Sequence, residues 1–512
     1  MKGEMATLAA RAAERFGDRT VLKLLGDGAK ASFAEVDAKA GRFASALKAR
    51  GVATGDRVVI HLPNGVDWLI AYHGAARLGA VVAPANFLLT ADEVAYIAAD
   101  SEARTVVLPV DRQEAMGEAL RRVNAQADLI AADPSRGLND AMGADSVAAT
   151  AVAADDLFTI GYTSGTTGRP KGAMLSHGAV FTSVAMTAMF HQRRAEDRVF
   201  TALPFPHVYG NVVMNAAFHC GYQLIVPPRF DAGAAIAAIG REGVTLFEGV
   251  PTMFYQMMAH PEIAGGDYRT LERCTVGGQT MPASSLAEAS RRFGCPILEL
   301  WGMTEVAGPA TSHSPHFPPV LGSIGLPFPG LEIRLMSVTH PGQLAADGEN
   351  GQLQVRGPQV TSGYWRNETA TRELLSSDGW LSTGDVAVRR DDGYLFIVDR
   401  LKDMIITGGY NIYPAELEQV LAGHPAVAMV AVASVADAEK GELAKAFVVL
   451  RPGLRCDQEE LAAHCRKHLA PYKVPRQFAF VDDLPKTSTG KILRRALRDT
   501  AATVTPQPRT VS

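Results

Sequence analysis

Apolar runs of strand length alternate with helix-length segments along most of the chain, and this alternation restricts the fold more than any other feature. Residues 57–62, 79–84 and 104–109 are predicted strands, and residues 67–78 and 91–99 are predicted helices between them. Strands that are joined through helices pair in parallel, because the helix carries the chain back to the starting edge of the sheet. The pattern therefore predicts an α/β fold in which helices and sheets form layers.

The pattern changes twice in the C-terminal part of the chain. Between residues 322 and 399, strand-length pieces are separated by turn-forming clusters, which predicts a small β-rich subdomain. After residues 400–403 (RLKD), strands and helices alternate again as α+β. We expect a large N-terminal domain of α/β-layered subdomains over residues 1–401 and a smaller α+β C-terminal domain over residues 402–512.

Composition excludes several functional classes. The formal charge of −4, from 50 basic and 54 acidic residues, gives no electrostatic reason to expect nucleic-acid binding. No run approaches 18 apolar residues, so no transmembrane segment is expected. The five cysteines are scattered and lack C-x-x-C spacing, which disfavours a disulfide framework or a zinc site. We predict a soluble cytoplasmic protein with small-molecule partners, and the sequence leaves open whether it forms a homo-oligomer.

The most specific local motif is YTSGTTGRPKG at residues 162–172. A strand is predicted before it at residues 157–162, and a helix after it at residues 180–190. Glycines let backbone N–H groups approach an anion closely, while hydroxyls and a lysine add donors and charge. The spacing of a Walker A loop is absent. We therefore predict a loop for a nucleoside triphosphate between a strand and a helix, with a polar surface turn as the alternative.

Four more motifs follow this loop in a fixed order. They are WGMTE at residues 301–305, TGD at 383–385, DRLKD at 399–403 and PKTSTGKILRR at 485–495. Together these motifs resemble those of the acyl-adenylate-forming superfamily, which contains acyl-CoA synthetases, aryl-CoA ligases, luciferases and peptide-synthetase adenylation domains. The resemblance covers residues 55–491. It implies that ATP and coenzyme A are substrates and that Mg²⁺ accompanies the ATP.

The resemblance also implies a nucleotide site. Thr304 would contact the α-phosphate, Glu305 would help to hold Mg²⁺ together with Thr166, and Trp301 would flank the adenine. Asp385 and Arg400 would bind the ribose, although an ion pair of Arg400 with Asp399 or Asp403 stays open as the alternative. The implied ATP- and AMP-binding set is Thr163, Ser164, Gly165, Thr166, Thr167, Lys171, Gly278, Gln279, Trp301, Gly302, Asp385 and Arg400.

Lys491 matches the catalytic lysine of the family. It would bind both the attacking carboxylate and the α-phosphate, where a flexible ammonium neutralises developing charge. In relatives the C-terminal domain is mobile and takes two orientations about a hinge, which corresponds to Lys402. One orientation delivers the lysine for adenylation. The other presents a loop along which Gly408, Gly409 and Tyr410 would line the path of coenzyme A.

The acyl pocket is implied by the FPHVYG segment at residues 205–210. His207 would lie near the substrate carboxylate and the path of the thiol. The implied catalytic residues are His207, Lys491, Thr304 and Glu305. Leu300 stands where dicarboxylate-specific relatives use arginine, so a second substrate carboxylate would be buried unpaired at a cost of several kcal/mol. The implied pocket residues are His207, Tyr209, Val213, Met253, Gly277 and Leu300.

These features predict an ATP-dependent, AMP-forming acyl-CoA synthetase for an apolar monocarboxylic acid, with a medium- or long-chain fatty acid as the first choice. Residues 205–207 contain no aspartate to hold an α-amino group, which argues against amino acids. Two alternatives stay open. One is an aryl or phenylpropenoid acid–CoA ligase with its ring against Tyr209, and the other is an acyl-AMP ligase that loads a carrier protein. A luciferase-like oxygenase and a non-catalytic nucleotide-binding protein rank below them.

Overall fold

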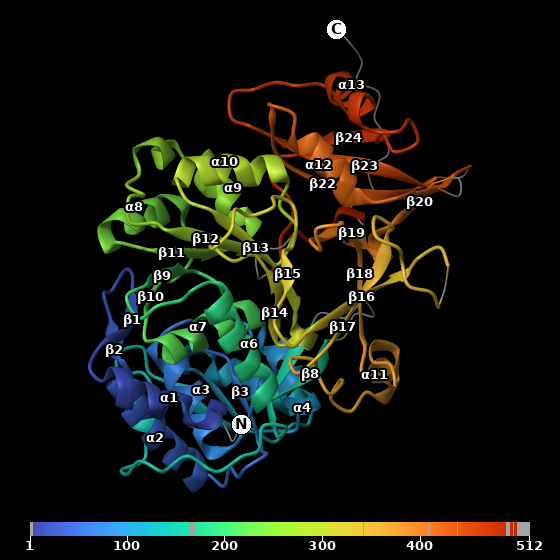
Figure 1. Ribbon diagram of the computed structural model, residues 1–512. Coiled ribbons are helices and arrows are strands. Elements are labelled where there is room, and N and C mark those ends of the chain that lie inside the picture. Colours follow the sequence, from blue (N-terminus) through green and yellow to red (C-terminus); the bar gives the residue numbers. More distant parts are fainter. Residues whose placement is uncertain are drawn as a thin grey trace.

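The computed structural model describes residues 4–163, 170–340, 342–407, 410–437, 439–487, 492–494 and 496–498. Two large sheets with their helices form the N-terminal part of the molecule, a small antiparallel sheet follows, and the C-terminal module lies at the opposite end from α1 (Glu4–Phe16) (Figure 1). No helix in this described part has the length and apolar content that a membrane span requires.

The first sheet has six strands in the order β6-β5-β3-β4-β7-β8. The central strand β3 pairs in parallel with both β4 and β5, which confirms the α/β pattern expected from the sequence. Its strands are β3 (Arg57–Ile60), β4 (Val81–Pro84), β5 (Ala103–Pro109), β6 (Asp128–Ala132), β7 (Leu157–Thr163) and β8 (Lys171–Ser176). Its helices are α2 (Phe33–Ala49), α3 (Val66–Leu78), α4 (Ala91–Asp100) and α5 (Gln113–Arg122).

One sequence prediction at the end of this sheet is wrong. The 162–172 motif does not connect a strand directly to a helix, because the antiparallel strand β8 comes before α6 (His177–Phe190). Lys171 therefore begins a strand, opposite Thr163. The helix starts six residues after Lys171, at His177, where the Ser176 hydroxyl accepts the Ala179 N–H as an N-cap.

The second sheet has nine strands in the order β15-β14-β13-β12-β11-β9-β10-β1-β2, and α7 contacts β14 and β10. Its central strands are buried on both faces, which explains their continuous apolar composition. The strands are β1 (Thr20–Leu24), β2 (Lys30–Ser32), β9 (Arg198–Thr201), β10 (Gln223–Val226), β11 (Leu246–Gly249), β12 (Arg273–Gly277), β13 (Ile297–Met303), β14 (Gly308–Ser312) and β15 (Leu326–Pro327). The helices are α7 (Val208–Cys220), α8 (Ala232–Glu242), α9 (Pro251–Ala259) and α10 (Ala283–Phe293).

A four-stranded antiparallel sheet follows, with α11 (Glu368–Leu374) beside it. Its strands are β16 (Glu332–Ser337), β17 (Gly351–Arg356), β18 (Leu381–Arg389) and β19 (Leu395–Arg400). The short 3₁₀ helix η5 (Leu401–Asp403) leads from β19 into the C-terminal module.

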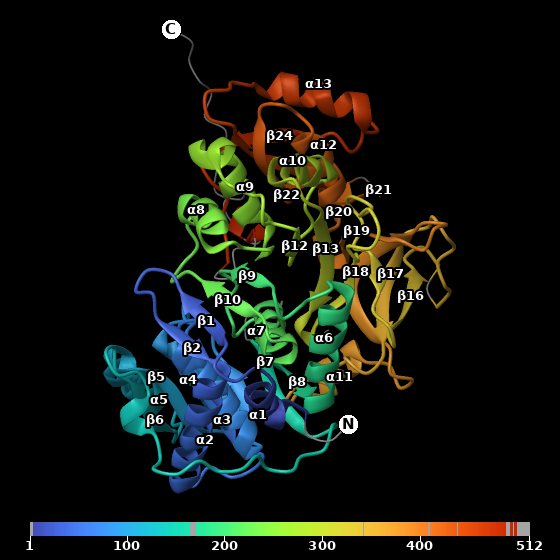
Figure 2. The same cartoon turned by 60° about the vertical axis from the view of Figure 1, so that its left-hand side comes forward.

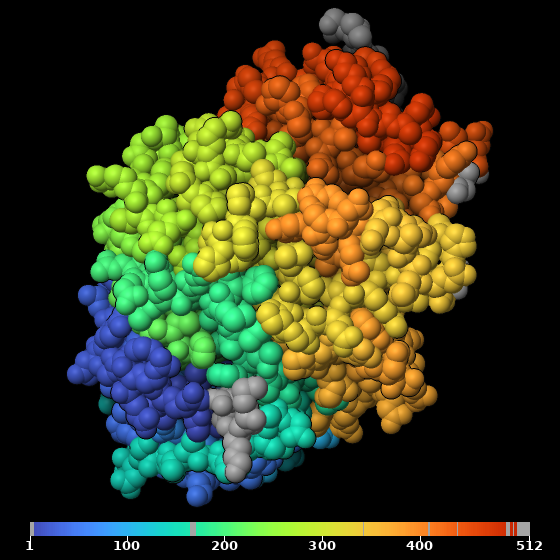
Figure 3. Space-filling view, viewed as in Figure 1, coloured from blue at the N-terminus to red at the C-terminus, as the bar shows by residue number. Residues whose placement is uncertain are grey.

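The C-terminal module is an α+β unit. Its elements are β20 (Ile405–Thr407), β21 (Tyr410–Ile412), α12 (Pro414–Ala422), β22 (Val427–Asp437), β23 (Gly441–Leu450), α13 (Gln458–His468) and β24 (Gln477–Phe480). Helix α12 contacts α10 of the preceding part, and the two lie side by side in Figure 2. The space-filling view shows the module packed closely against the second sheet region (Figure 3).

Candidate active site

Of the residues that the sequence assigns to the nucleotide, Trp301 and Arg400 both contact Asp385. The indole N–H of Trp301 donates to Asp385 Oδ2 at 2.7 Å, and Arg400 Nε lies 3.2 Å from Asp385 Oδ1. Strand register causes the second contact, because Asp385 on β18 pairs with Arg400 on β19. Of the three side chains, that of Arg400 is exposed, whereas Trp301 and Asp385 are buried. Arg400 thus pairs with Asp385, rather than with either acid considered from sequence.

Glu305 is buried and lies beside the end of the 162–172 motif. Its Oε1 accepts the hydroxyl of Tyr364 at 2.7 Å, and the ammonium of Lys171 lies 5.4 Å from the centre of the Tyr364 ring. Burial and the Glu305 carboxylate both raise the pKa of Tyr364 well above its usual range, so the phenol stays protonated as a donor. Tyr364 therefore joins a predicted metal-binding carboxylate to a predicted phosphate-binding lysine.

Near these residues, glycines allow the backbone to lie close to neighbouring side chains. A Cβ on Gly161 would lie 2.6 Å from Thr304 Cγ2, so β7 can touch the WGMTE motif only through a glycine. A Cβ on Gly277 would lie 2.2 Å from Leu300 Cδ1, which means that Leu300 fills the space above this glycine. Gly278 has φ +91°, in the left-handed region that favours glycine, and it turns the chain away from β12.

The predicted acyl-pocket residues lie around α7. His207 is the N-cap of this helix, and its Nδ1 accepts the Tyr209 N–H at 3.3 Å. Tyr209, Val213 and Met253 are buried. The Tyr209 hydroxyl donates to Glu248 Oε2 at 2.9 Å and lies 2.6 Å from Thr275 Oγ1. Tyr209 is therefore fixed by two strands of the second sheet, β11 and β12.

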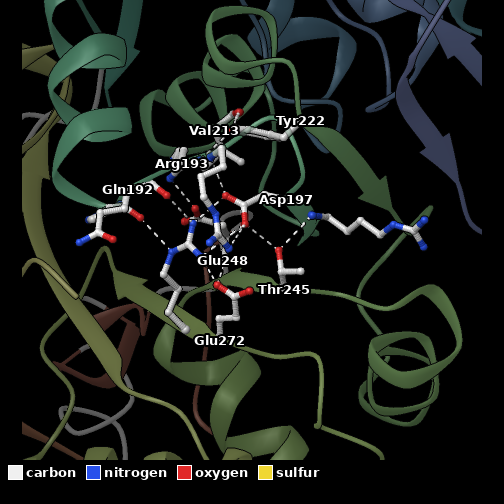
Figure 4. A network of polar contacts seen from close by, with 12 residues as sticks. Gln192, Arg193, Asp197, Val213, Tyr222, Thr245, Glu248 and Glu272 are labelled. Atoms are coloured by element: carbon white, nitrogen blue, oxygen red, sulfur yellow. Dashed lines mark hydrogen bonds and ion pairs between the residues drawn. The ribbon is translucent and has the colours of Figure 1, made fainter. Parts of the chain in front are cut away.

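Glu248 is also one half of a fully enclosed ion pair with Arg193, shown in Figure 4. Arg193 Nη1 donates to the Tyr222 hydroxyl at 2.7 Å, and that hydroxyl donates to the Val213 carbonyl at 2.5 Å. Burial lowers the pKa of Arg193, but the Glu248 carboxylate and Tyr222 together raise it above its usual range, so the guanidinium keeps its charge. We call Arg193, Glu248, Tyr209, Tyr222 and Thr275 the pocket network.

Gln279, which the sequence also assigns to the nucleotide, bonds to the main chain of Ile492. Its Oε1 accepts the Ile492 N–H at 2.9 Å, and its Nε2 donates to the Ile492 carbonyl at 3.3 Å. Lys402 lies exposed in η5, and Tyr410 is exposed and stacks on Tyr472 with ring centres 4.7 Å apart. The predicted site residues Ser164, Gly165, Thr166, Thr167, Gly408, Gly409 and Lys491 lie outside the described residues.

Two family models match the chain. That of the AMP-binding enzymes covers residues 9–365, and that of the AMP-binding enzyme C-terminal domain covers residues 416–491. The chain belongs to this family. It is an acid–CoA ligase of the AMP-forming type, and ATP and coenzyme A are the substrates that such ligases share.

Relatives of the ligase differ in their named substrates. A long-chain-fatty-acid–CoA ligase of Bacillus subtilis is 34% identical, over 95% of this chain and 92% of the relative. A feruloyl-CoA synthase of Amycolatopsis is 38% identical, over 92% of this chain and 94% of the relative. ATP-bound MatB from Rhodopseudomonas palustris superposes with a TM-score of 0.90 at 32% identity, covering 98% of this chain and 99% of that one.

Sequence reasoning missed the contacts that hold the ligase's site together. Tyr364 lies in a turn-rich stretch with no motif, and it reaches Glu305 across 59 residues of chain. Arg193 and Glu248 also lack a local signal, since a charged residue in an apolar stretch does not show its partner. The one available hint was Glu248 itself, an acid directly after the apolar residues Leu246 and Phe247.

Proposed function

We propose that this ligase activates an apolar monocarboxylic acid, with a medium- or long-chain fatty acid as the first choice. The supporting observation is that the buried charges beside the predicted acyl pocket are already paired, Arg193 with Glu248. A substrate carboxylate at the far end of the pocket would find no uncommitted partner in this pair. Leu300 adds an apolar side chain over Gly277, which favours a hydrocarbon or aryl tail.

The reaction has two steps. The carboxylate oxygen of the acid attacks the α-phosphorus of ATP, the bond to the β-phosphate oxygen breaks, and pyrophosphate leaves. The thiolate of coenzyme A then attacks the acyl carbonyl, and AMP leaves with the bonding electron pair. We assign Asp385 and Arg400 to the ribose, Thr304 to the α-phosphate and Lys491 to the charge that develops during the first step.

Glu305 fits the Mg²⁺ that would accompany ATP. Its carboxylate is a hard oxygen donor, and the Tyr364 hydroxyl orients it by binding Oε1. The described residues contain no group of three His, Cys, Asp or Glu side chains able to hold a metal ion. One carboxylate with phosphate oxygens and water is the usual arrangement for Mg²⁺. When bound, the ion would neutralise phosphate charge, and we propose Thr166 as its second protein contact.

We also propose two domains, residues 1–401 and 402–512, with residues 322–399 as a β-rich subdomain of the first. The two family models leave residues 366–415 between them, and the proposed hinge Lys402 is exposed within that interval. Gly408, Gly409 and Tyr410 would line the path of coenzyme A. The exposed ring of Tyr410 is consistent with that role.

An aryl or phenylpropenoid acid is the second candidate substrate, and the 38% identity to a feruloyl-CoA synthase favours it. Pyrophosphate release from Mg·ATP with octanoate, palmitate, benzoate, ferulate and malonate, with and without coenzyme A, separates the candidates. We expect release and thioester formation with the fatty acids and none with malonate. Preference for benzoate or ferulate would replace the substrate proposal. Release without any thioester would instead indicate that a carrier protein is the acceptor.

A further inference from the structure

The side chain of Gln279 joins the N-terminal part of the ligase to the segment that carries Lys491. Its amide bonds to both the N–H and the carbonyl of Ile492, at 2.9 and 3.3 Å, as a neighbouring strand residue would. Ile492 follows Lys491 directly in the sequence. Gln279 therefore recognises main chain, and any rotation of the C-terminal module away from β12 breaks both bonds together.

Ile492 is itself held in place within the C-terminal module. It forms an antiparallel bridge with Lys486, and the next N–H, that of Leu493, donates to the Pro485 carbonyl at 2.8 Å. Lys491 directly precedes Ile492 in the sequence. A bond to the main chain of Ile492 therefore restrains the chain next to Lys491 more than a bond elsewhere on the module would.

Arg494 fixes the other side of the same segment within the C-terminal module. It lies 2.6 Å from Glu418 of α12 and 3.8 Å from Asp403 of η5. Arg494 also lies 3.5 Å from Asp399 at the end of β19, three residues before the proposed hinge. The segment after Lys491 is thus held by Arg494 to its own module and to the residues beside the hinge, and by Gln279 to the N-terminal part beyond β12. Of these contacts, we expect that of Gln279 to depend most on how the two parts are oriented.

We propose that Gln279 is the positioning residue that holds the C-terminal module in the orientation for adenylation and releases it for thioester formation. The proposal rests on the proposed function, because it assigns one of the two half-reactions to the orientation in this structure. Gln279 then contributes to the first half-reaction and contributes nothing to the second. This role differs from the nucleotide contact that the sequence predicts for Gln279.

Another contact crosses the same boundary and serves as a matched control. Arg451 Nη2 lies 3.1 Å from Glu288 Oε2 on α10, and the Arg451 side chain is 38% exposed. Exposed pairs of this kind contribute little. Arg451→Ala should therefore change either half-reaction by about twofold or less, although it removes a contact between the same two parts.

The test measures the half-reactions separately. Exchange between ATP and pyrophosphate reports adenylation, and thioester formation from supplied acyl-adenylate and coenzyme A reports the second step. For Gln279→Ala we expect exchange to fall about ten- to fiftyfold through kcat, with an unchanged KM for ATP and an unchanged second step. Gln279→Glu keeps an acceptor for the Ile492 N–H, so it should retain more exchange activity than Gln279→Ala.

Three results would overturn the proposal. Equal loss in both half-reactions would indicate a general structural role, and unchanged exchange would show that the contact is dispensable. A raised KM for ATP would restore the nucleotide role predicted from sequence. If the wild-type enzyme exchanged pyrophosphate with none of the acids tested, the proposed substrate class would fail instead. Circular dichroism and thermal melting of both variants confirm that a loss in exchange does not reflect unfolding.

Discussion

Two networks of charged side chains in this ligase contrast in their surroundings. In the pocket network, the side chains of Arg193 and Glu248 are both 0% exposed, and every member lies in the region of α6, α7 and the second sheet. The second network surrounds Lys402, and we call Asp399, Asp403, Glu418, Arg494 and Arg498 the hinge network. Its Arg494 is 22% and its Arg498 38% exposed.

The difference in exposure indicates which of the two networks resists separation of its ion pairs more strongly. Arg193 and Glu248 are shielded from water, so each charge is compensated mainly by the other. Separating them would leave an uncompensated buried charge, which is strongly unfavourable. In the hinge network only the arginines keep partial access to water, while Asp399 is 1% and Glu418 13% exposed, and the network spans Asp399 before the hinge and Glu418 after it. Separating its pairs should therefore cost less than separating the fully enclosed pair of Arg193 and Glu248. The pocket network thus supports a fixed wall for the predicted acyl pocket, and the hinge network is the less enclosed of the two.

Breaking the pocket network should give the largest effect. Glu248→Ala leaves the buried Arg193 without its counter-charge, so we expect the free energy of unfolding to fall by about 3–5 kcal/mol. Urea denaturation measures this loss. The double variant Arg193→Met/Glu248→Leu removes both charges and should recover most of the stability. A single variant as stable as the wild type would show that water reaches Arg193 and that the two networks do not differ.

Titrating the hinge network should give the next effect. Burial raises the pKa of Asp399 from 3.8 to about 6, despite the opposing charge of Arg494. The folded state then holds this proton more tightly than the unfolded state. This contribution to stability is complete below pH 3.8 and is lost as pH rises through 6, by at most about 3 kcal/mol. Asp399→Asn should remove this part of the pH dependence of unfolding. An identical pH profile in the variant would contradict the prediction.

Removing the central cation of the hinge network should have a smaller effect on stability. Arg494→Ala loses charge-assisted contacts to Glu418 and Asp399, worth about 2 kcal/mol. Because Arg494 is three residues from Lys491, we also expect adenylation to fall more than thioester formation does. Arg498→Ala, which removes a more exposed contact to Asp403, is the control. Equal effects of the two variants would argue against a central role for Arg494.

The smallest effect should come from one hydroxyl of the pocket network. Tyr209→Phe keeps the ring but removes the donor to Glu248, at a cost of about 1 kcal/mol. If Tyr209 lines the acyl pocket, KM for the acid should change while KM for ATP stays constant. Steady-state kinetics with both substrates varied provide the measurement. A change confined to ATP would place Tyr209 elsewhere.

The sequence predicted the elements better than the contacts between them. Helices α3 (Val66–Leu78) and α4 (Ala91–Asp100) lie within one residue of the predicted bounds, 67–78 and 91–99, because their patterns are local. Strand β8 was missed, since its sequence KGAMLS does not alternate and begins inside a glycine-rich motif. The contact of Gln279 with Ile492 spans 213 residues, and no local pattern encodes such a pairing.

Among the candidate site residues, Trp301, Asp385 and Arg400 were selected from motifs, and the structure brings them together. The contacts between these residues could not be predicted from the motifs. The pairing of Arg400 with Asp385 depends on the register of β18 and β19, and the sequence alone offered Asp399 and Asp403 as closer choices. Register is set by a whole sheet face, so it is not readable from one strand.

The end of β19 has a consequence for communication within the molecule. Successive side chains of a strand point to opposite faces, so Arg400 reaches Asp385 on one side while Asp399 reaches Arg494 and the Ala415 N–H on the other. A single peptide bond therefore separates the proposed ribose contact from the support of the C-terminal module. A ligand that shifted Arg400 would also shift Asp399, so filling the proposed nucleotide site would act directly on the contact between Asp399 and Arg494.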